Sequence, residues 1–184
     1  VNAWYPGEQG GTAVADVLFG DYNPAGRLPL TYYKSLDELP AFDDYDITKG
    51  RTYKYFKGDV LYPFGYGLSY SSFKYSDLKV KDGANTVSVS FRLKNTGKRK
   101  GDEVAQVYVR IPETGGVVPI KELKGFRRIP LKSGESRVVE IELDKEQLRY
   151  WDAGLGRFIV PQGAFDIMVG ASSKDIRLQT VINL

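Results

Sequence analysis

The sequence predicts a mainly β fold, in which antiparallel sheets pack face to face as an immunoglobulin-like sandwich behind a short α/β segment. Three observations carry this prediction. From residue 73 onward apolar residues recur at every second position, which is the period of a strand with one buried face. Turn-forming pairs such as Asp82-Gly83 and Ser133-Gly134 separate the alternating runs. About 110 residues in about seven strands match the size of such a sandwich.

The first segment, residues 1–33, indicates a remnant of an α/β sandwich domain. It opens without Met or a signal peptide, on residues that read as the end of a strand, so we expect a fragment of a longer chain. Over residues 8–19 the apolar residues follow helical spacing, namely Ala13, Val14, Val17 and Leu18. Glu8 is expected in the first helical turn, where it favours the dipole, and Gly20 in a left-handed cap. Residues 26–32 read as a second extended stretch.

The second segment, residues 34–72, has no clear periodicity but holds many aromatic residues separated by Gly and Pro. The aromatic residues are Tyr45, Tyr53, Tyr55, Phe56, Tyr62, Phe64, Tyr66 and Tyr70. Side chains of this size argue against disorder, because burying them against a surface is favourable. We therefore expect an aromatic-rich connector that is ordered and wraps between two bodies.

The third segment, residues 73–184, contains the alternating runs that predict the sandwich. In each run one face is apolar and the other polar, which is typical of antiparallel sheets that cover a core on one side. The predicted strands are residues 73–80, 87–93, 105–111, 123–131, 139–143, 165–169 and 176–182.

Composition excludes several kinds of chemistry. The chain has no Cys and no His, so disulfides, thiolate or imidazole metal ligands and the Ser-His-Asp triad are all excluded. No stretch approaches the ~20 apolar residues of a membrane span, so no membrane partner is expected. Lys and Arg number 26 against 23 Asp and Glu, and the charges are interleaved, so no nucleic-acid partner is expected either. The one basic run, Lys98-Arg99-Lys100, is predicted to be a solvated turn.

Three stretches carry a more specific pattern. They are WYPGEQGG with ADVLFGDYNPAGRLP over residues 4–29, GRTYKYF with LYPFGYGLSY over residues 50–70, and NTG, GDEVAQVYV and KELKGF over residues 95–126. In order and spacing the chain resembles the C-terminal part of a glycoside hydrolase family 3 enzyme of the β-glucosidase or β-xylosidase type. The resemblance implies a barrel, an α/β sandwich domain and a fibronectin type III-like domain, of which this chain would hold the end of the second and all of the third.

The same resemblance implies a function for the parent protein. That protein would hydrolyse terminal β-linked glucose or xylose with retention, without a cofactor, using an Asp on the barrel and a Glu in an earlier loop. Both carboxylates would precede Val1, so we expect no catalytic residue here and no activity of the isolated chain. Its partners would be the N-terminal barrel and α/β domains of the same protein, and the oligosaccharide or glycoside substrate would bind through the parent. A periplasmic or secreted location is also implied.

The carboxylates of the chain itself do not predict a catalytic pair. A retaining glycosidase needs two carboxyl groups about 5–5.5 Å apart. Glu8 and Asp16, eight positions apart on one helix, would be roughly 12 Å apart, which is too far. The pair Asp102-Glu103 is interpreted as the flank of a turn. The run at residues 43–46 lacks the Gly and Glu of a calcium loop, so a solvated acidic turn and no metal are expected.

Substrate contact is predicted, if anywhere, at residues 43–56 of the connector. The candidate residues are Asp43, Asp44, Arg51, Tyr53 and Tyr55. Aromatic faces stack on sugar rings, and an Arg can donate paired hydrogen bonds to hydroxyls. The alternative interpretation, which we prefer, is that the aromatic residues fill the seam between the α/β body and the sandwich. A second hypothesis for the whole chain is a stand-alone carbohydrate-binding or adhesive module.

Overall fold

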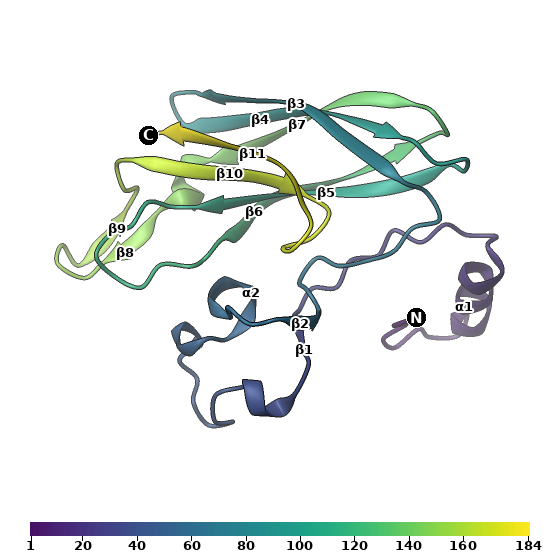
Figure 1. Ribbon diagram of the computed structural model, residues 1–184, viewed down its shortest axis with the longest axis horizontal. Coiled ribbons are helices and arrows are strands. Elements are labelled where there is room, and N and C mark those ends of the chain that lie inside the picture. Colours follow the sequence, from purple (N-terminus) through teal and green to yellow (C-terminus); the bar gives the residue numbers. More distant parts are fainter.

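The computed structural model describes residues 1–184 (Figure 1). Its elements are α1 (Gly10–Phe19), β1 (Tyr32–Tyr33), the 3₁₀ turns η1 (Leu36–Glu38) and η2 (Ile47–Lys49), α2 (Thr52–Tyr55), β2 (Val60–Tyr62), β3 (Phe73–Asp82), β4 (Thr86–Asn95), β5 (Gly101–Arg110), β6 (Glu122–Leu131), β7 (Ser136–Asp144), η3 (Lys145–Leu148), β8 (Tyr150–Asp152), β9 (Arg157–Ile159), β10 (Ala164–Gly170) and β11 (Ile176–Asn183). None of the helices combines the length and the hydropathy of a membrane span.

Two antiparallel sheets form the sandwich, one of four strands in the order β11-β10-β5-β6 and one of three strands in the order β3-β4-β7. A cluster of 18 buried residues fills the space between them. Its largest fully buried members are Phe91 and Phe165, which are 1% and 0% exposed. Burying one such side chain contributes about 1.5–3 kcal/mol, so this core is the main source of stability. The predicted mainly β sandwich is confirmed.

All seven predicted runs are strands, but two short pairs were not predicted. The β8–β9 hairpin has three residues on each side, and its Trp151 and Phe158 are 55% and 56% exposed. Their rings contact each other at 5.2 Å, edge to face, outside the main core. Because each strand has only three residues and none of them is fully buried, alternation could not reveal them. The pairing of β1 with β2 was also not predicted, because β1 has only the two residues Tyr32 and Tyr33 and is too short to show alternation.

The N-terminal segment follows the prediction only in its helix. Gly20 ends α1 with φ +87°, and its N–H donates to the carbonyl of Asp16, as expected for a left-handed cap. Glu8 was placed wrongly: α1 begins at Gly10 after the N-cap Gln9, so no carboxylate lies in the first turn. The opening residues form no strand, because no strand of the chain lies beside them to complete a ladder.

The predicted extended stretch at residues 26–32 is also mostly outside the sheets. Only Tyr32 belongs to a strand. Upstream of it, the N–H of Leu28 donates to the carbonyl of Tyr66, and the N–H of Gly65 donates back to the carbonyl of Leu28. The stretch therefore pairs with the connector, through Leu28 and through Tyr32 of β1, and not with a sheet of its own.

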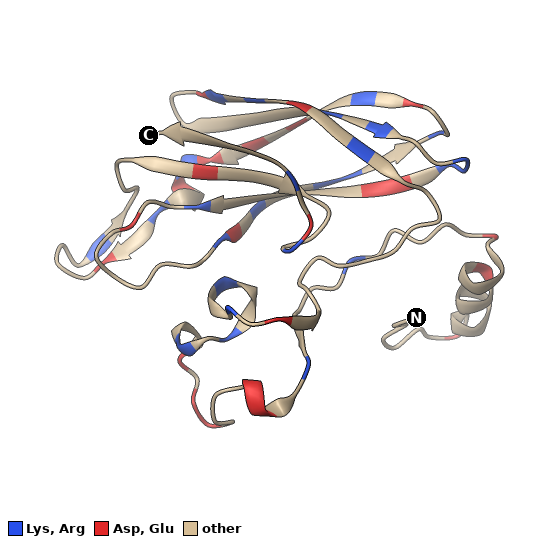
Figure 2. Cartoon of the chain, in the orientation of Figure 1, with Lys and Arg blue, Asp and Glu red and all other residues tan.

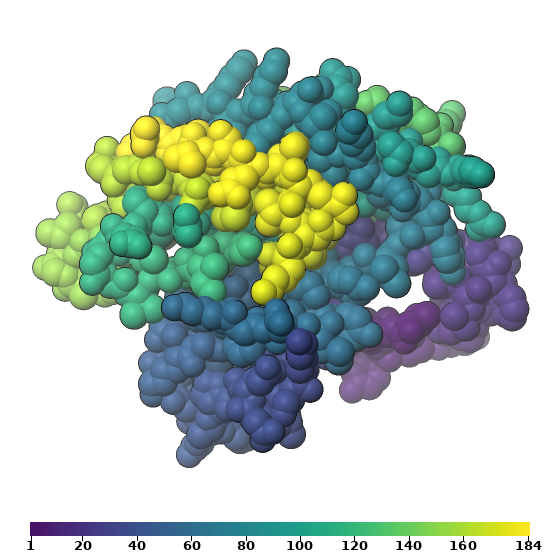
Figure 3. Space-filling view, in the orientation of Figure 1, coloured from purple at the N-terminus to yellow at the C-terminus, as the bar shows by residue number.

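The connector is ordered and lies below the sandwich in Figure 1, and its end reaches the helix α1, where the hydroxyl of Tyr70 donates to the carbonyl of Val17 at 2.6 Å. Local capping holds its turns: Ser35 and Glu38 form a capping box on η1, and Asp46 accepts the N–H of Thr48 at η2. Figure 3 shows the blue connector in contact with the sandwich, with the purple N-terminal segment next to it. The contact surface between these parts is therefore the place to look for a functional site.

Candidate functional site

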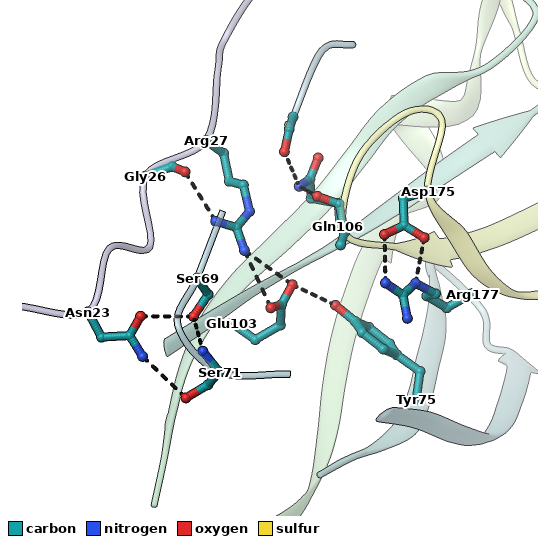
Figure 4. Close-up of polar contacts among 12 residues, drawn as sticks. Asn23, Gly26, Arg27, Ser69, Ser71, Tyr75, Glu103, Gln106, Asp175 and Arg177 are labelled. Atoms are coloured by element: carbon teal, nitrogen blue, oxygen red, sulfur yellow. Dashed lines mark hydrogen bonds and ion pairs between the residues drawn. The ribbon is translucent and has the colours of Figure 1, made fainter. Parts of the chain in front are cut away.

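A buried ion pair joins the N-terminal segment to the sandwich (Figure 4). Arg27 Nη2 donates to both carboxylate oxygens of Glu103 at 3.3 Å, and the two side chains are only 9% and 4% exposed. The hydroxyl of Tyr75 donates to Glu103 Oε1 at 3.0 Å. Burial, together with the nearby carboxylate, raises the pKa of Tyr75, so its hydroxyl stays a donor. The interpretation of Glu103 as a turn flank was wrong, because it points inward from β5.

Asn23 is a second link, and its amide contacts two other parts of the chain. Its Oδ1 accepts the N–H of Tyr70 at 2.8 Å and the hydroxyl of Ser69 at 3.0 Å. Its Nδ2 donates to the carbonyl of Lys100 at 2.9 Å and to Ser71 Oγ at 3.2 Å. A single side chain thus fixes the N-terminal segment to the end of the connector and to the turn between β4 and β5.

The basic run at residues 98–100 belongs to this contact. Arg99 Nη1 donates to the carbonyl of Gly20 at 3.0 Å, and the guanidinium lies 5.9 Å from the ring of Tyr70. The carbonyl of Arg99 accepts the hydroxyl of Ser71 at 2.7 Å. The prediction of a merely solvated turn was wrong for Arg99, although the side chains of the run are exposed. The turn holds the C-terminal end of α1.

Gln106 and Tyr108 of β5 lie against the connector on the side of the sandwich. Gln106 Nε2 donates to the carbonyls of Gly65 at 3.1 Å and Ala171 at 2.6 Å. The hydroxyl of Tyr108 donates to Gln106 Oε1 at 2.5 Å, and the two residues are 2% and 0% exposed. Burial raises the pKa of Tyr108, which keeps this donor neutral. Each polar atom of the Gln106 side chain is therefore satisfied inside the protein.

Aromatic residues of the connector pack against the same surface. The ring of Tyr53 stacks on Phe64 at 4.2 Å and meets Tyr108 edge to face at 5.9 Å. The hydroxyl of Tyr53 accepts the N–H of Leu123 at 3.0 Å, and burial raises the pKa of that hydroxyl. Further along, Tyr33 and Phe56 pack edge to face at 4.9 Å. These contacts are those of residues that fill a seam between two bodies.

The predicted substrate-binding residues do not converge on one point. Arg51 donates to the carbonyls of Asp44 at 3.0 Å and Ala41 at 2.7 Å, so its guanidinium shapes the connector loop. Asp44 in turn forms an ion pair with Lys49 at 2.8 Å. Asp43 is exposed at the same loop.

The two tyrosines of the predicted set lie on or near α2 and are only partly exposed. Tyr53 faces the sandwich, whereas no hydrogen bond of Tyr55 ties it to the residues of the loop. The structure thus brings Asp44 and Arg51 together and separates them from Tyr53. Contact of this loop with a sugar stays a prediction.

Two domain families match the chain, and the first match includes nearly all of the connector. Residues 1–70 match the glycosyl hydrolase family 3 C-terminal domain, and residues 103–173 match the fibronectin type III-like domain. A xylan 1,4-β-xylosidase from Xylanibacter ruminicola is 46% identical over 98% of this chain. The chain belongs to glycoside hydrolase family 3. This membership confirms the resemblance inferred from the sequence motifs.

Other members are similar over nearly the whole chain. A periplasmic β-glucosidase from Salmonella typhimurium is 37% identical over 96% of it. The crystal structure of a β-glucosidase from Kluyveromyces marxianus in complex with glucose aligns with 99% of it at 35% identity and a TM-score of 0.92. The chain spans 21%, 25% and 24% of the lengths of these three proteins, or about a quarter.

A pocket of about 390 Å³ at the seam is lined by two carboxylates, Glu103 and Asp175. A retaining glycosidase needs two carboxyl groups, one as the nucleophile and one as the acid/base. The contacts of Glu103 and Asp175 show whether they could take these roles. Glu103 is bound by Arg27, and Asp175 is bound by Arg177 at 2.7 Å (Figure 4). Each carboxylate is occupied by an arginine, and neither is free to attack a sugar. The pocket therefore holds two ion pairs, of which Arg27–Glu103 joins two segments, and not a catalytic pair of carboxylates.

The ion pair between Arg27 and Glu103 was missed at the sequence level, although one signal pointed to it. Glu103 has the same parity along β5 as Ala105 and Val107, which face the core. A carboxylate at an inward position of a strand requires a buried partner. The position of that partner, 76 residues earlier, is not visible in the pattern.

A third polar link joins α2 to β6 and predicts a dependence of stability on pH. Lys54 and Lys124 bind Glu122 at 2.6 and 2.9 Å. Burial alone would raise the pKa of Glu122, but the two ammonium hydrogen bonds outweigh it and hold the pKa below the usual 4.5. Since the pKa is lower in the folded state, this stabilisation is fully present above pH 4.5 and is lost as the pH falls through the folded pKa.

Replacing Lys54 with methionine is expected to reduce that pH dependence. At pH 7 the variant should lose about 1 kcal/mol of unfolding free energy, because the pair is partly exposed, and at pH 3 the loss should be smaller. Urea unfolding at several pH values measures both. The control is Lys94→Met, an exposed lysine of β4 outside every ion pair, whose effect should not vary with pH. If the free energy of unfolding varies with pH in the same way for Lys54→Met and the wild type, the ion pair with Glu122 is not the source of the pH dependence.

Proposed function

We propose that this chain is the C-terminal part of a retaining β-glycosidase that removes terminal β-linked glucose or xylose from oligosaccharides or glycosides. The role of the chain itself is to position the domains of the parent protein relative to one another and to stabilise them. The observation that carries the proposal is the coverage: proteins named β-glucosidase and β-xylosidase match nearly all of this chain, which spans about a quarter of their length. The two carboxylates of the chemistry then belong to the other three quarters.

The organisation that goes with this function has three parts. We assign residues 1–33 to the end of the α/β sandwich domain, 34–72 to the connector and 73–184 to the fibronectin type III-like domain. The gap between the two family matches, residues 71–102, holds the start of the third part, whereas the first match spans both the first part and nearly all of the connector. The partners would be the N-terminal barrel and α/β domains of the same protein.

Exposed apolar side chains on the N-terminal segment support such partners. Tyr5 and Phe19 are 100% and 85% exposed, and Trp4 and Leu18 lie near them in sequence with more than half of their surface exposed. Apolar residues gathered in this way are typical of a surface that another domain covers. For the location we propose the periplasm or the exterior, which the name of the Salmonella relative supports.

Activity measurements test the proposal directly. The isolated chain should give no turnover of aryl β-glucosides or β-xylosides, whereas the longer protein that contains it should hydrolyse at least one of them. The control is the longer protein assayed at the same molar concentration and temperature. Turnover by the pure chain would overturn the proposed division of labour, and an inactive longer protein would overturn the proposed reaction.

A carbohydrate-binding role is the second candidate, and exposed aromatic residues of the connector favour it. Phe42 and Tyr45 are 95% and 86% exposed beside the predicted contact residues Asp43 and Asp44. Titration with xylo- and cello-oligosaccharides should then show saturable binding that Tyr45→Ala removes. The control is Trp151→Ala on the distant β8–β9 hairpin. Flat titrations would exclude this role for the chain.

A further inference from the structure

A second pocket lies between the connector and two loops of the sandwich, and lysines surround it. Its volume is about 360 Å³, within the range of small-molecule sites. Lys57 comes from the connector, Lys121 from the loop before β6, and Lys174 from the turn between β10 and β11. Figure 2 shows basic positions on that turn and on the connector beneath it. None of the 11 residues that line the pocket is Asp or Glu.

The three ammonium groups have no counterion within the protein. None of the ion pairs of the chain includes Lys57, Lys121 or Lys174. Lys121 is half-buried, and burial first, then the charges of Lys174 and Arg110, lower its pKa. Like charges held together without a partner are unfavourable, and an anion in the pocket would relieve their repulsion.

The rest of the lining suits an organic anion better than a bare ion. Tyr53, Phe56 and Pro63 supply apolar surface, and aromatic rings present flat faces to ring-shaped ligands. Thr31 adds a buried hydroxyl oxygen that has no hydrogen-bond partner. The pocket therefore combines a cationic rim, an apolar wall and an unsatisfied polar group.

We propose that this pocket binds the anionic group of an acidic sugar, either a uronate or a sugar phosphate. Ammonium groups form strong, charge-assisted hydrogen bonds to carboxylate and phosphate oxygens. The choice of a sugar as the carrier rests on the proposed glycosidase function, whereas the anionic group follows from the lysines alone. Since the lining comes from both the connector and the sandwich, a bound ligand would also hold these two parts together and raise the melting temperature.

Calorimetric titration tests the proposal with three probes: glucuronate, glucose 6-phosphate and neutral glucose. We expect saturable binding of at least one acidic sugar, no binding of glucose, and weaker binding at higher salt. The two acidic probes distinguish the carboxylate from the phosphate source. The double variant Lys121→Gln/Lys174→Gln should bind at least tenfold more weakly, and the control Lys94→Gln should bind as the wild type does. The titration is run on this chain and on the longer protein.

Measuring the stability of the variants separates a loss of binding from a loss of folding. Lys121→Gln removes a half-buried charge that has no partner, so the free energy of unfolding should stay equal or rise. Equal binding of glucose and the acidic sugars, or unchanged affinity in the double variant, would overturn the inference. If the acidic sugars fail to bind while the longer protein hydrolyses β-glucosides, the inference alone fails. An inactive longer protein that still binds them would refute only the proposed function.

Discussion

Replacing Arg27 with methionine is expected to lower the free energy of unfolding by about 3–5 kcal/mol. Glu103 is only 3% exposed, and the change leaves its carboxylate with the hydroxyl of Tyr75 as its remaining partner. A buried charge without a counterion is among the most destabilising features a protein can contain. Equilibrium unfolding in urea at pH 7 measures the loss.

The matched control is Arg128→Met. Arg128 lies on β6, the strand that pairs with β5. Arg128 binds Asp102, the neighbour of Glu103 on β5, and also donates to the hydroxyl of Tyr22 at 2.9 Å. Its pair is 54% and 22% exposed, so the loss should stay below about 1 kcal/mol. The double variant Arg27→Met/Glu103→Leu should recover most of the stability, because no charge is then left buried. Equal losses for the two single variants would show that burial does not decide the strength of this link.

The strands of the sandwich could be predicted because each has one buried face. In β4, Val89 and Phe91 are at most 1% exposed and lie opposite Ile141 and Val139 of β7, so the apolar residues recur with period two. The same rule explains the failures. The β8–β9 hairpin has three residues in each strand and none of them is fully buried, so it leaves no alternation. The start of α1 was misplaced by two residues, because periodicity marks the apolar face of a helix but not its first turn.

The contacts of the seam could be predicted only in part. The dense aromatic series indicated a surface that holds the connector, and the stacking of Tyr53 on Phe64 agrees with that interpretation. Which polar groups meet across the seam depends on how the chain folds back on itself. Arg27 and Glu103 look like ordinary surface charges in the sequence, and only their approach in space turns them into a buried pair. Asn23 was missed for the same reason.

Replacing Gly65 with alanine is expected to lower the free energy of unfolding by about 2–5 kcal/mol, for two reasons that add. Its φ of +81° is strained for any residue with a Cβ. In addition, the new Cβ would overlap Gln106 Oε1 and lie 2.9 Å from the hydroxyl of Tyr108. The amide of Gln106 cannot move aside without giving up its hydrogen bonds to Gly65 and Ala171. Urea unfolding, followed by tyrosine fluorescence, measures the loss.

Alanine substitutions at two other glycines measure the backbone strain and the packing overlap separately. Gly134 has φ +76° and no atom within 4 Å of the added Cβ, so Gly134→Ala should cost only the conformational strain, about 1–2 kcal/mol. Gly67 has no positive φ, but its Cβ would overlap the carbonyl oxygen of Gly26, so Gly67→Ala should cost about 1–3 kcal/mol through packing alone. If Gly65→Ala costs no more than Gly134→Ala, the close approach to Gln106 is unimportant. If its cost is near the sum of the other two, backbone strain and the close approach to Gln106 both contribute at Gly65.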